Sequence, residues 1–131
     1  MAFGNYARQL REQRYRVNRR YSIRQTAQRI GIEPAYLSKI ERSDVSPPSE
    51  ETIRRLAVDL GEDVDLLLAL AGKVASDIRE IIVKRPVLFT ELIRGLSDIP
   101  DHELTSLVHQ VRNANWEDYE ENSSKQLEQI G

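Results

Sequence analysis

The chain has no cysteine, one methionine, one tryptophan and two phenylalanines among its 131 residues. Without cysteine, a disulfide scaffold, a thiolate zinc site and a cysteine nucleophile are all excluded. The longest apolar run is Leu66–Ala71, and a membrane-spanning helix needs about 20 apolar residues. No apolar segment follows a basic N-terminal start, so we expect no signal peptide and a soluble, cytoplasmic protein.

The formal net charge of −2 conceals two halves of opposite sign. Residues 1–42 hold ten Arg or Lys against three Asp or Glu, a net charge of +7. Residues 43–131 hold nine against eighteen, a net charge of −9. Phosphate contacts are local and the Debye length is about 8 Å at physiological salt, so the basic half can bind nucleic acid although the whole chain is acidic. The alternative is that these arginines only form the solvent-exposed faces of helices.

Apolar residues repeat at helical spacing, and no segment has the alternation of a strand. Five helices are expected in the first 72 residues, over residues 3–16, 23–30, 34–42, 50–60 and 64–70. Ser22, Ser49 and Asp63 are the expected N-caps, and Gly31 and Gly61 are expected to end helices. The sequence therefore predicts an all-α fold.

Beyond Gly72 the helical pattern restarts with three further helices, separated at Pro86 and at residues 97–100. We divide the chain into residues 1–72, a helical segment over 73–116, and an acidic tail over 117–131 that is expected to be disordered. The apolar content of the helical segment exceeds what short exposed helices need, which predicts a dimerisation module; the alternative is an extension of the monomer core. The expected dimerisation residues are Ile78, Ile82, Leu88, Phe89, Leu92, Ile93, Leu104, Leu107 and Trp116.

Residues 22–42, SIRQTAQRIGIEPAYLSKIER, have the form of a helix-turn-helix. Gly31 permits a sharp turn between two short helices, and Ala27 is small where the helices must meet. Leu37 and Ile40 are expected to anchor the second helix, so that its outer face can enter the major groove of duplex DNA. That groove is about 12 Å wide and accepts one helix.

The N-terminal half resembles the DNA-binding domain of the Xre/phage-repressor family. The matching residues are Leu10-Arg11-Glu12, Thr26-Ala27, Ile30-Gly31-Ile32, Tyr36 through Arg42, Pro48-Ser49, Thr52, Leu56 and Ala57. The resemblance implies a five-helix domain whose base-contacting residues are Pro34, Ala35, Tyr36, Ser38 and Lys39. It implies a phosphate contact from Arg42 and a structural ion pair between Arg11 and Glu41. Further phosphate contacts are expected from Arg19, Arg20, Ser22 and Arg24, in the basic connection before the second helix and at that helix's start.

The chemistry of these residues limits what each can read. Pro34 and Ala35 offer only apolar contacts, for example to a thymine methyl, whereas Ser38 and Lys39 can form hydrogen bonds with base edges. Tyr36 either contacts the DNA backbone or packs on the preceding helix. Many members of the family have Gln at the position of Ile23, where it contacts a phosphate; here the neighbouring Arg24 is expected to make that contact.

Residues Lys84–Val108 also resemble C-terminal segments of bacterial repressors that a zinc metallopeptidase inactivates. A metallopeptidase is thus one possible partner. No cofactor, metal site or enzyme activity is expected, because His102 and His109 have no third ligand and no catalytic set is present.

Together these features predict a sequence-specific transcriptional regulator, a dimeric repressor that binds a palindromic operator in the bacterial or phage-infected cytoplasm, associated with the nucleoid. The main alternative is an antitoxin that neutralises a toxin partner and represses its own operon. An activator is a third candidate, because the position of the operator relative to the promoter sets the sign of regulation.

Overall fold

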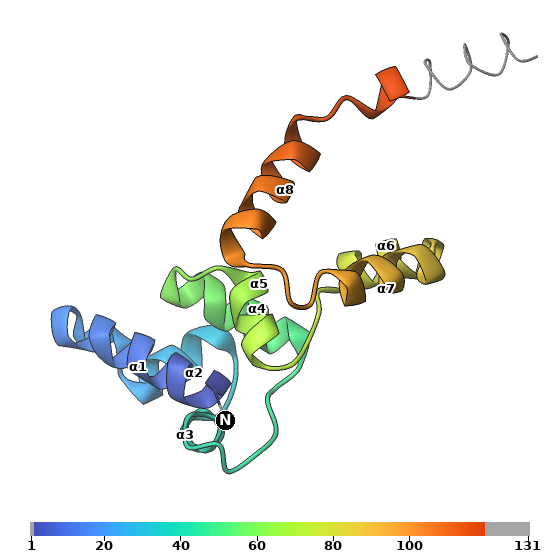
Figure 1. The fold of residues 1–131 in the computed structure, drawn as a ribbon. Helices are drawn as coiled ribbons and strands as arrows, with labels where there is room; N and C mark the ends of the chain where they lie inside the picture. Colours follow the sequence, from blue (N-terminus) through green and yellow to red (C-terminus); the bar gives the residue numbers. More distant parts are fainter. Residues whose placement is uncertain (1, 120–131) are drawn as a thin grey trace, which may run out of the picture. The chain divides into compact units, whose positions relative to one another are not determined.

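The computed structural model describes residues 2–119, and within them every regular element is a helix. This confirms the predicted all-α fold. The chain divides into two compact units, Met1–Lys84 and Arg85–Gly131 (Figure 1). No helix in the described part combines the length and the apolar character needed to cross a membrane. Most of the acidic tail, residues 120–131, lies outside the described residues.

The first unit begins with the five α-helices that the sequence predicts. They are α1 (Ala2–Val17), α2 (Ile23–Ile30), α3 (Pro34–Glu41), α4 (Glu50–Leu60) and α5 (Val64–Leu70). The hydroxyls of Ser22 and Ser49 and the carboxylate of Asp63 accept backbone N–H groups at the N-termini of α2, α4 and α5. Gly31 and Gly61 end α2 and α4 at φ of 79° and 70°, a conformation that costs glycine little. These caps were predicted and are confirmed.

The connection between α1 and α2 contains a short 3₁₀ helix, η1 (Arg19–Tyr21), where the sequence predicts only a link. Its N-cap is Asn18, whose side-chain oxygen accepts the backbone N–H of Arg20 at 3.0 Å. This polar contact helps to order a segment that has no buried residue of its own.

Side chains from all five helices form one hydrophobic core. Its largest fully buried members are Phe3, Leu37, Ile53, Leu56, Leu60, Leu67 and Leu68. Ala27 and Leu37 have no exposed surface and Ile40 is 3% exposed, as expected for the residues that join α2 to α3. Burying one such Leu or Ile contributes about 1.5–3 kcal/mol, so the core fixes α3 against α1 and α2.

The N-terminus of α1 lies directly against the C-terminus of α3. A Cβ added to Gly4 would lie 2.9 Å from Ser43 Oγ and 3.2 Å from Glu41 O, and it would also clash with the carbonyl oxygen of Ile40. The two helices therefore approach more closely than any side chain at position 4 permits. Further along α1, Tyr6 Oη donates to Glu62 Oε2 at 2.8 Å and ties α1 to the loop before α5.

Helix α6 (Ser76–Lys84) belongs to the first unit through Glu50, the first residue of α4. Glu50 Oε1 accepts the backbone N–H of Ser76 at 3.0 Å and its hydroxyl at 3.1 Å, and Glu50 Oε2 pairs with Arg79 at 3.3 Å. Ala75, just before α6, is buried. Contacts thus continue past residue 72, and the proposed boundary there stays a prediction.

The second unit contains α7 (Pro86–Gly95) and α8 (Asp101–Asn113). Neither helix has a buried residue. Residues 116–119 are also helical, although the sequence analysis places most of them in a disordered tail. Large apolar side chains of this unit, including Leu88, Leu92, Val108 and Trp116, remain exposed.

Candidate nucleic-acid interface

Helix α3 has one face in the core and one face in solvent. Leu37 and Ile40 are buried, whereas Ala35, Lys39 and Arg42 are exposed and Ser38 is half-buried. Residues 35, 38, 39 and 42 follow the spacing of one helix face, because side chains three and four residues apart are neighbours. This outer face consists of small and basic side chains, which suits the major groove of DNA.

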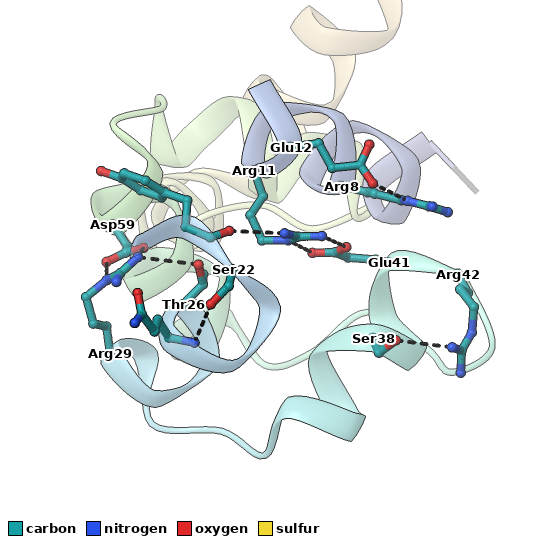
Figure 2. A network of polar contacts seen from close by, with 12 residues as sticks. Arg8, Arg11, Glu12, Ser22, Thr26, Arg29, Ser38, Glu41, Arg42 and Asp59 are labelled. Atoms are coloured by element: carbon teal, nitrogen blue, oxygen red, sulfur yellow. Dashed lines mark hydrogen bonds and ion pairs between the residues drawn. The ribbon is translucent and has the colours of Figure 1, made fainter. Parts of the chain in front are cut away.

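A buried ion pair holds α3 against α1. Arg11 Nε donates to Glu41 Oε2 at 2.7 Å and Arg11 Nη2 donates to Glu41 Oε1 at 2.9 Å, a two-pronged contact seen at the centre of Figure 2. Arg11 Nη1 also donates to the carbonyl oxygen of Tyr21 at 3.1 Å. Only 8% of the Arg11 side chain and 4% of the Glu41 side chain are exposed. The pair that the resemblance implies is present, and it joins α1, η1 and α3.

The C-terminus of α3 closes in a Schellman motif. The backbone N–H of Ser43 donates to Ile40 O at 3.0 Å, and the backbone N–H of Asp44 donates to Lys39 O at 2.9 Å. Ser43 has a φ of 61°, the one non-glycine residue with positive φ in the described part of the chain. The turn brings Asp44 back toward the helix, where its Oδ2 pairs with Arg42 Nε at 2.9 Å.

Arg42 also contacts the outer face of α3. Its Nη1 donates to Ser38 Oγ at 3.1 Å, and Figure 2 shows the two side chains joined along the helix. Both Arg42 and Asp44 are about half exposed, with side-chain exposures of 53% and 55%. One residue expected to contact phosphate is therefore linked to one expected to read bases.

A polar hollow of about 170 Å³ lies where α1, the start of α2 and α3 meet. Arg8, Arg11, Glu12, Ile23, Ser38, Glu41 and Arg42 line it. Arg8 Nε donates to Glu12 Oε1 at 2.9 Å, and this hydrogen bond lowers the pKa of the Glu12 carboxyl. Arg8 is a member of this surface that the sequence analysis missed; its place three residues before Arg11, on the same face of α1, was the available signal.

Basic side chains are also exposed on α2 and η1. Arg24, in the first turn of α2, is exposed and lines a second hollow of about 260 Å³ with Gln28, Ile32, Glu33 and Pro34. Arg19 and Arg20 in η1 are exposed, and the Arg19 guanidinium lies 4.5 Å from the centre of the Tyr15 ring. Ser22 is half-buried and uses its oxygen to cap α2.

Arg29 fixes the position of η1. It pairs with Asp59 through contacts of 2.7 and 3.1 Å, which raise the pKa of the guanidinium, and its Nη1 donates to Arg20 O. Its guanidinium also lies 5.0 Å from the centre of the Tyr21 ring. Arg29 is thus used in holding the fold, and η1 is held where Arg19 and Arg20 project from the first unit.

The remaining expected site residues lie as follows. Pro34 is half-buried at the start of α3, and Tyr36 is 36% exposed, at the margin between packing and solvent. His102 and His109 are both exposed in α8, and the described residues contain no group of three potential metal ligands around them.

In the comparison with protein families, the model of a helix-turn-helix domain matches residues 2–70, slightly more than half of the chain. Searches of curated proteins and of solved structures find no match. The matched residues include α1 to α5 and therefore the whole surface described above. The chain belongs to the helix-turn-helix domain family and is a DNA-binding regulator.

Proposed function

We propose that this protein is a sequence-specific transcriptional repressor that binds a palindromic operator as a dimer. The observation that carries the proposal is the outer face of α3. It presents Ala35, Ser38 and Lys39 to solvent, while Leu37 and Ile40 anchor the opposite face in the core. A helix fixed in this way can enter the major groove without rearrangement.

Within this proposal, Lys39 and Ser38 are the hydrogen-bonding readers of base edges, with Lys39 directed to guanine. Ala35 and Pro34 contribute apolar contacts to thymine methyl groups, and Tyr36 contacts the backbone. So few hydrogen-bonding readers imply that DNA shape contributes to specificity.

The affinity is proposed to come largely from phosphate contacts. Arg19, Arg20, Arg24 and Arg42 are exposed on η1, α2 and the end of α3. Ser22 adds a hydroxyl at the start of α2. Such contacts position the protein on the duplex without selecting a sequence.

The dimer is proposed to form through the helices that follow residue 73. None of α6, α7 and α8 has a buried residue, and their apolar side chains are exposed or, as at Ile82, Phe89 and Leu107, half-buried in the single chain. A second copy can cover these faces. A stable interface needs about 800 Å² from each partner. Two domains could then reach half-sites one helical turn apart.

The same exposed faces would serve the other candidate function, an antitoxin whose C-terminal helices cover a toxin. A metallopeptidase that inactivates the repressor would also act on this part of the chain. Co-purification from the native cell distinguishes the homodimeric repressor, the antitoxin and the cleavable repressor. A homodimer would be recovered without any other protein. A toxic partner would indicate an antitoxin, and a metallopeptidase would indicate a repressor that is regulated by cleavage.

Selection of bound duplexes from a random DNA pool tests the proposal. We expect a palindrome with half-sites about 10 base pairs apart and a dimer by sedimentation at tens of micromolar. A single unpaired site with a monomeric protein would contradict the dimer. No enrichment of any sequence would contradict sequence-specific binding.

The phosphate contacts are tested by the salt dependence of binding. Replacing Arg19, Arg20, Arg24 and Arg42 with Gln should flatten the plot of log K against log[salt] by about 0.9 per lost contact. A control with the same charge change replaces Arg54, Arg55, Arg79 and Arg94, and it should leave the slope as it is. An unchanged slope in the first variant would overturn the assignment.

A further inference from the structure

An acidic residue lies at the end of α3, next to the surface that is proposed to face DNA. The Schellman turn at Ser43 directs Asp44 back toward the helix, and Asp44 Oδ2 pairs with Arg42 Nε at 2.9 Å. A carboxylate in this place repels a DNA phosphate, and it occupies the guanidinium that would bind one.

This contact distinguishes Arg42 from the other arginines proposed to hold phosphate. Within residues 2–119, no ion pair is found for Arg19, Arg20 or Arg24, whereas Arg42 has Asp44. Arg42 Nη1 also donates to Ser38 Oγ at 3.1 Å (Figure 2). In the free protein Arg42, a proposed phosphate contact, is thus bound both to Asp44 and to Ser38, a proposed base reader.

We propose that Asp44 restrains DNA binding by competing with a backbone phosphate for Arg42. The proposal rests on the proposed function and concerns the regulation of the same surface. The pair is about half exposed, so it is weak and a phosphate can displace the carboxylate. The restraint lowers the affinity of a single domain for DNA.

The first test is Asp44→Asn in the full chain, which removes the charge and keeps the shape of the side chain. The probe is a mixed-sequence duplex of about 10 base pairs, too short for two half-sites. We expect binding about two- to fivefold tighter than that of the wild type. The salt slope should change little, because Arg42 contacts the same phosphate in both proteins once the carboxylate is displaced. Equal or weaker binding would overturn the proposal.

The matched control is Asp65→Asn, the same change in α5 of the same unit. Asp65 is exposed, and its carboxylate has no ion pair in the described part of the chain. It should leave both the affinity and the salt slope unchanged. An equal gain in this control would show that overall charge is responsible, and it would also overturn the proposal.

A double-mutant cycle tests whether Asp44 acts through Arg42. In an Arg42→Gln background, adding Asp44→Asn should produce little gain, because the guanidinium for which they compete is absent. The same gain in both backgrounds would show simple repulsion and would overturn the competition. If the wild type itself shows no salt-dependent binding to any duplex, the proposed function fails instead, and the two failures are distinguishable.

Discussion

At the scale of single residues, the arginines of the basic half serve different purposes according to their surroundings. Arg11 is buried and joins three elements, so its charge is unavailable to DNA. Arg29 is tied to Asp59 and to the carbonyl of Arg20. Arg24 is exposed in the first turn of α2. The amino-acid composition shows the excess of positive charge, but only the ion pairs and burial in the structure show which guanidinium groups can reach a phosphate.

The buried pair leads to the first prediction, the effect of Glu41→Gln. The change leaves the Arg11 guanidinium buried without a counter-charge, so the free energy of unfolding should fall by about 3–5 kcal/mol. Urea unfolding followed by circular dichroism measures the loss. The matched control is Glu51→Gln, whose pair with Arg55 is exposed, with side-chain exposures of 63% and 56%, and should cost less than about 1 kcal/mol.

A loss in Glu41→Gln no greater than that of the control would contradict this account. A second variant makes the comparison sharper. Arg11→Met combined with Glu41→Leu removes both charges, and such replacements of buried pairs are often neutral. The double variant should therefore be more stable than Glu41→Gln, although the carbonyl of Tyr21 loses its donor.

Gly4 leads to a second prediction at this scale. The Cβ of Gly4→Ala would clash with the backbone carbonyl of Ile40, which can move only if α1 and α3 separate. We expect a loss of about 1–3 kcal/mol in the free energy of unfolding. Gly95→Ala is the control, because nothing lies within 4 Å of the added Cβ and the helix propensity improves. A Gly4 variant as stable as the wild type would show that α1 can shift freely.

At the scale of elements, the helices of the first unit follow from local signals. The residues Ser22, Ser49 and Asp63 indicate N-caps, and Gly31 and Gly61 indicate ends, because each satisfies a backbone requirement within its own turn. The left-handed turn at Ser43 could not be predicted in this way, since serine gives no such signal. The close approach at Gly4 could not be predicted either, because it joins residues about 40 positions apart.

The contact between α4 and α6 leads to a prediction about pH. The backbone N–H of Ser76, its hydroxyl, Arg54 and Arg79 all favour the ionised Glu50 carboxylate and lower its pKa from the ordinary value of 4.5. A lowered pKa in the folded state means that the contact stabilises the fold above that ordinary value. The contribution is lost as the pH falls through the lower pKa of the folded state.

The amide resonance of Ser76 measures this transition directly. In the wild type its chemical shift should titrate with a midpoint below 4.5. In Glu50→Gln the resonance should not titrate in this range, whereas Glu51→Gln, on the neighbouring residue, should leave the titration in place. A midpoint at or above the ordinary value would show that Ser76 and Arg79 do not hold the carboxylate.

At the scale of the whole molecule, the two units differ in how much of their own apolar surface they bury. The first unit buries apolar residues of α1 to α5 in one core, although its helix α6 has none buried, and neither helix of the second unit has a buried residue. Periodicity predicted α7 and α8, since it depends only on spacing along the chain. It could not identify what covers their apolar faces, because spacing along one helix does not specify the surface that packs against it.

The last prediction concerns assembly. Leu92→Arg with Val108→Arg places charges on the exposed apolar faces of α7 and α8, where burial in an interface would be costly. Sedimentation should show a monomer in place of a dimer. Binding to the selected palindrome should fall to the level of a half-site duplex, while binding to the half-site duplex stays unchanged. Ser106→Arg, opposite the apolar face of α8, should preserve the dimer. A double variant that still dimerises would show that the two copies meet through another surface.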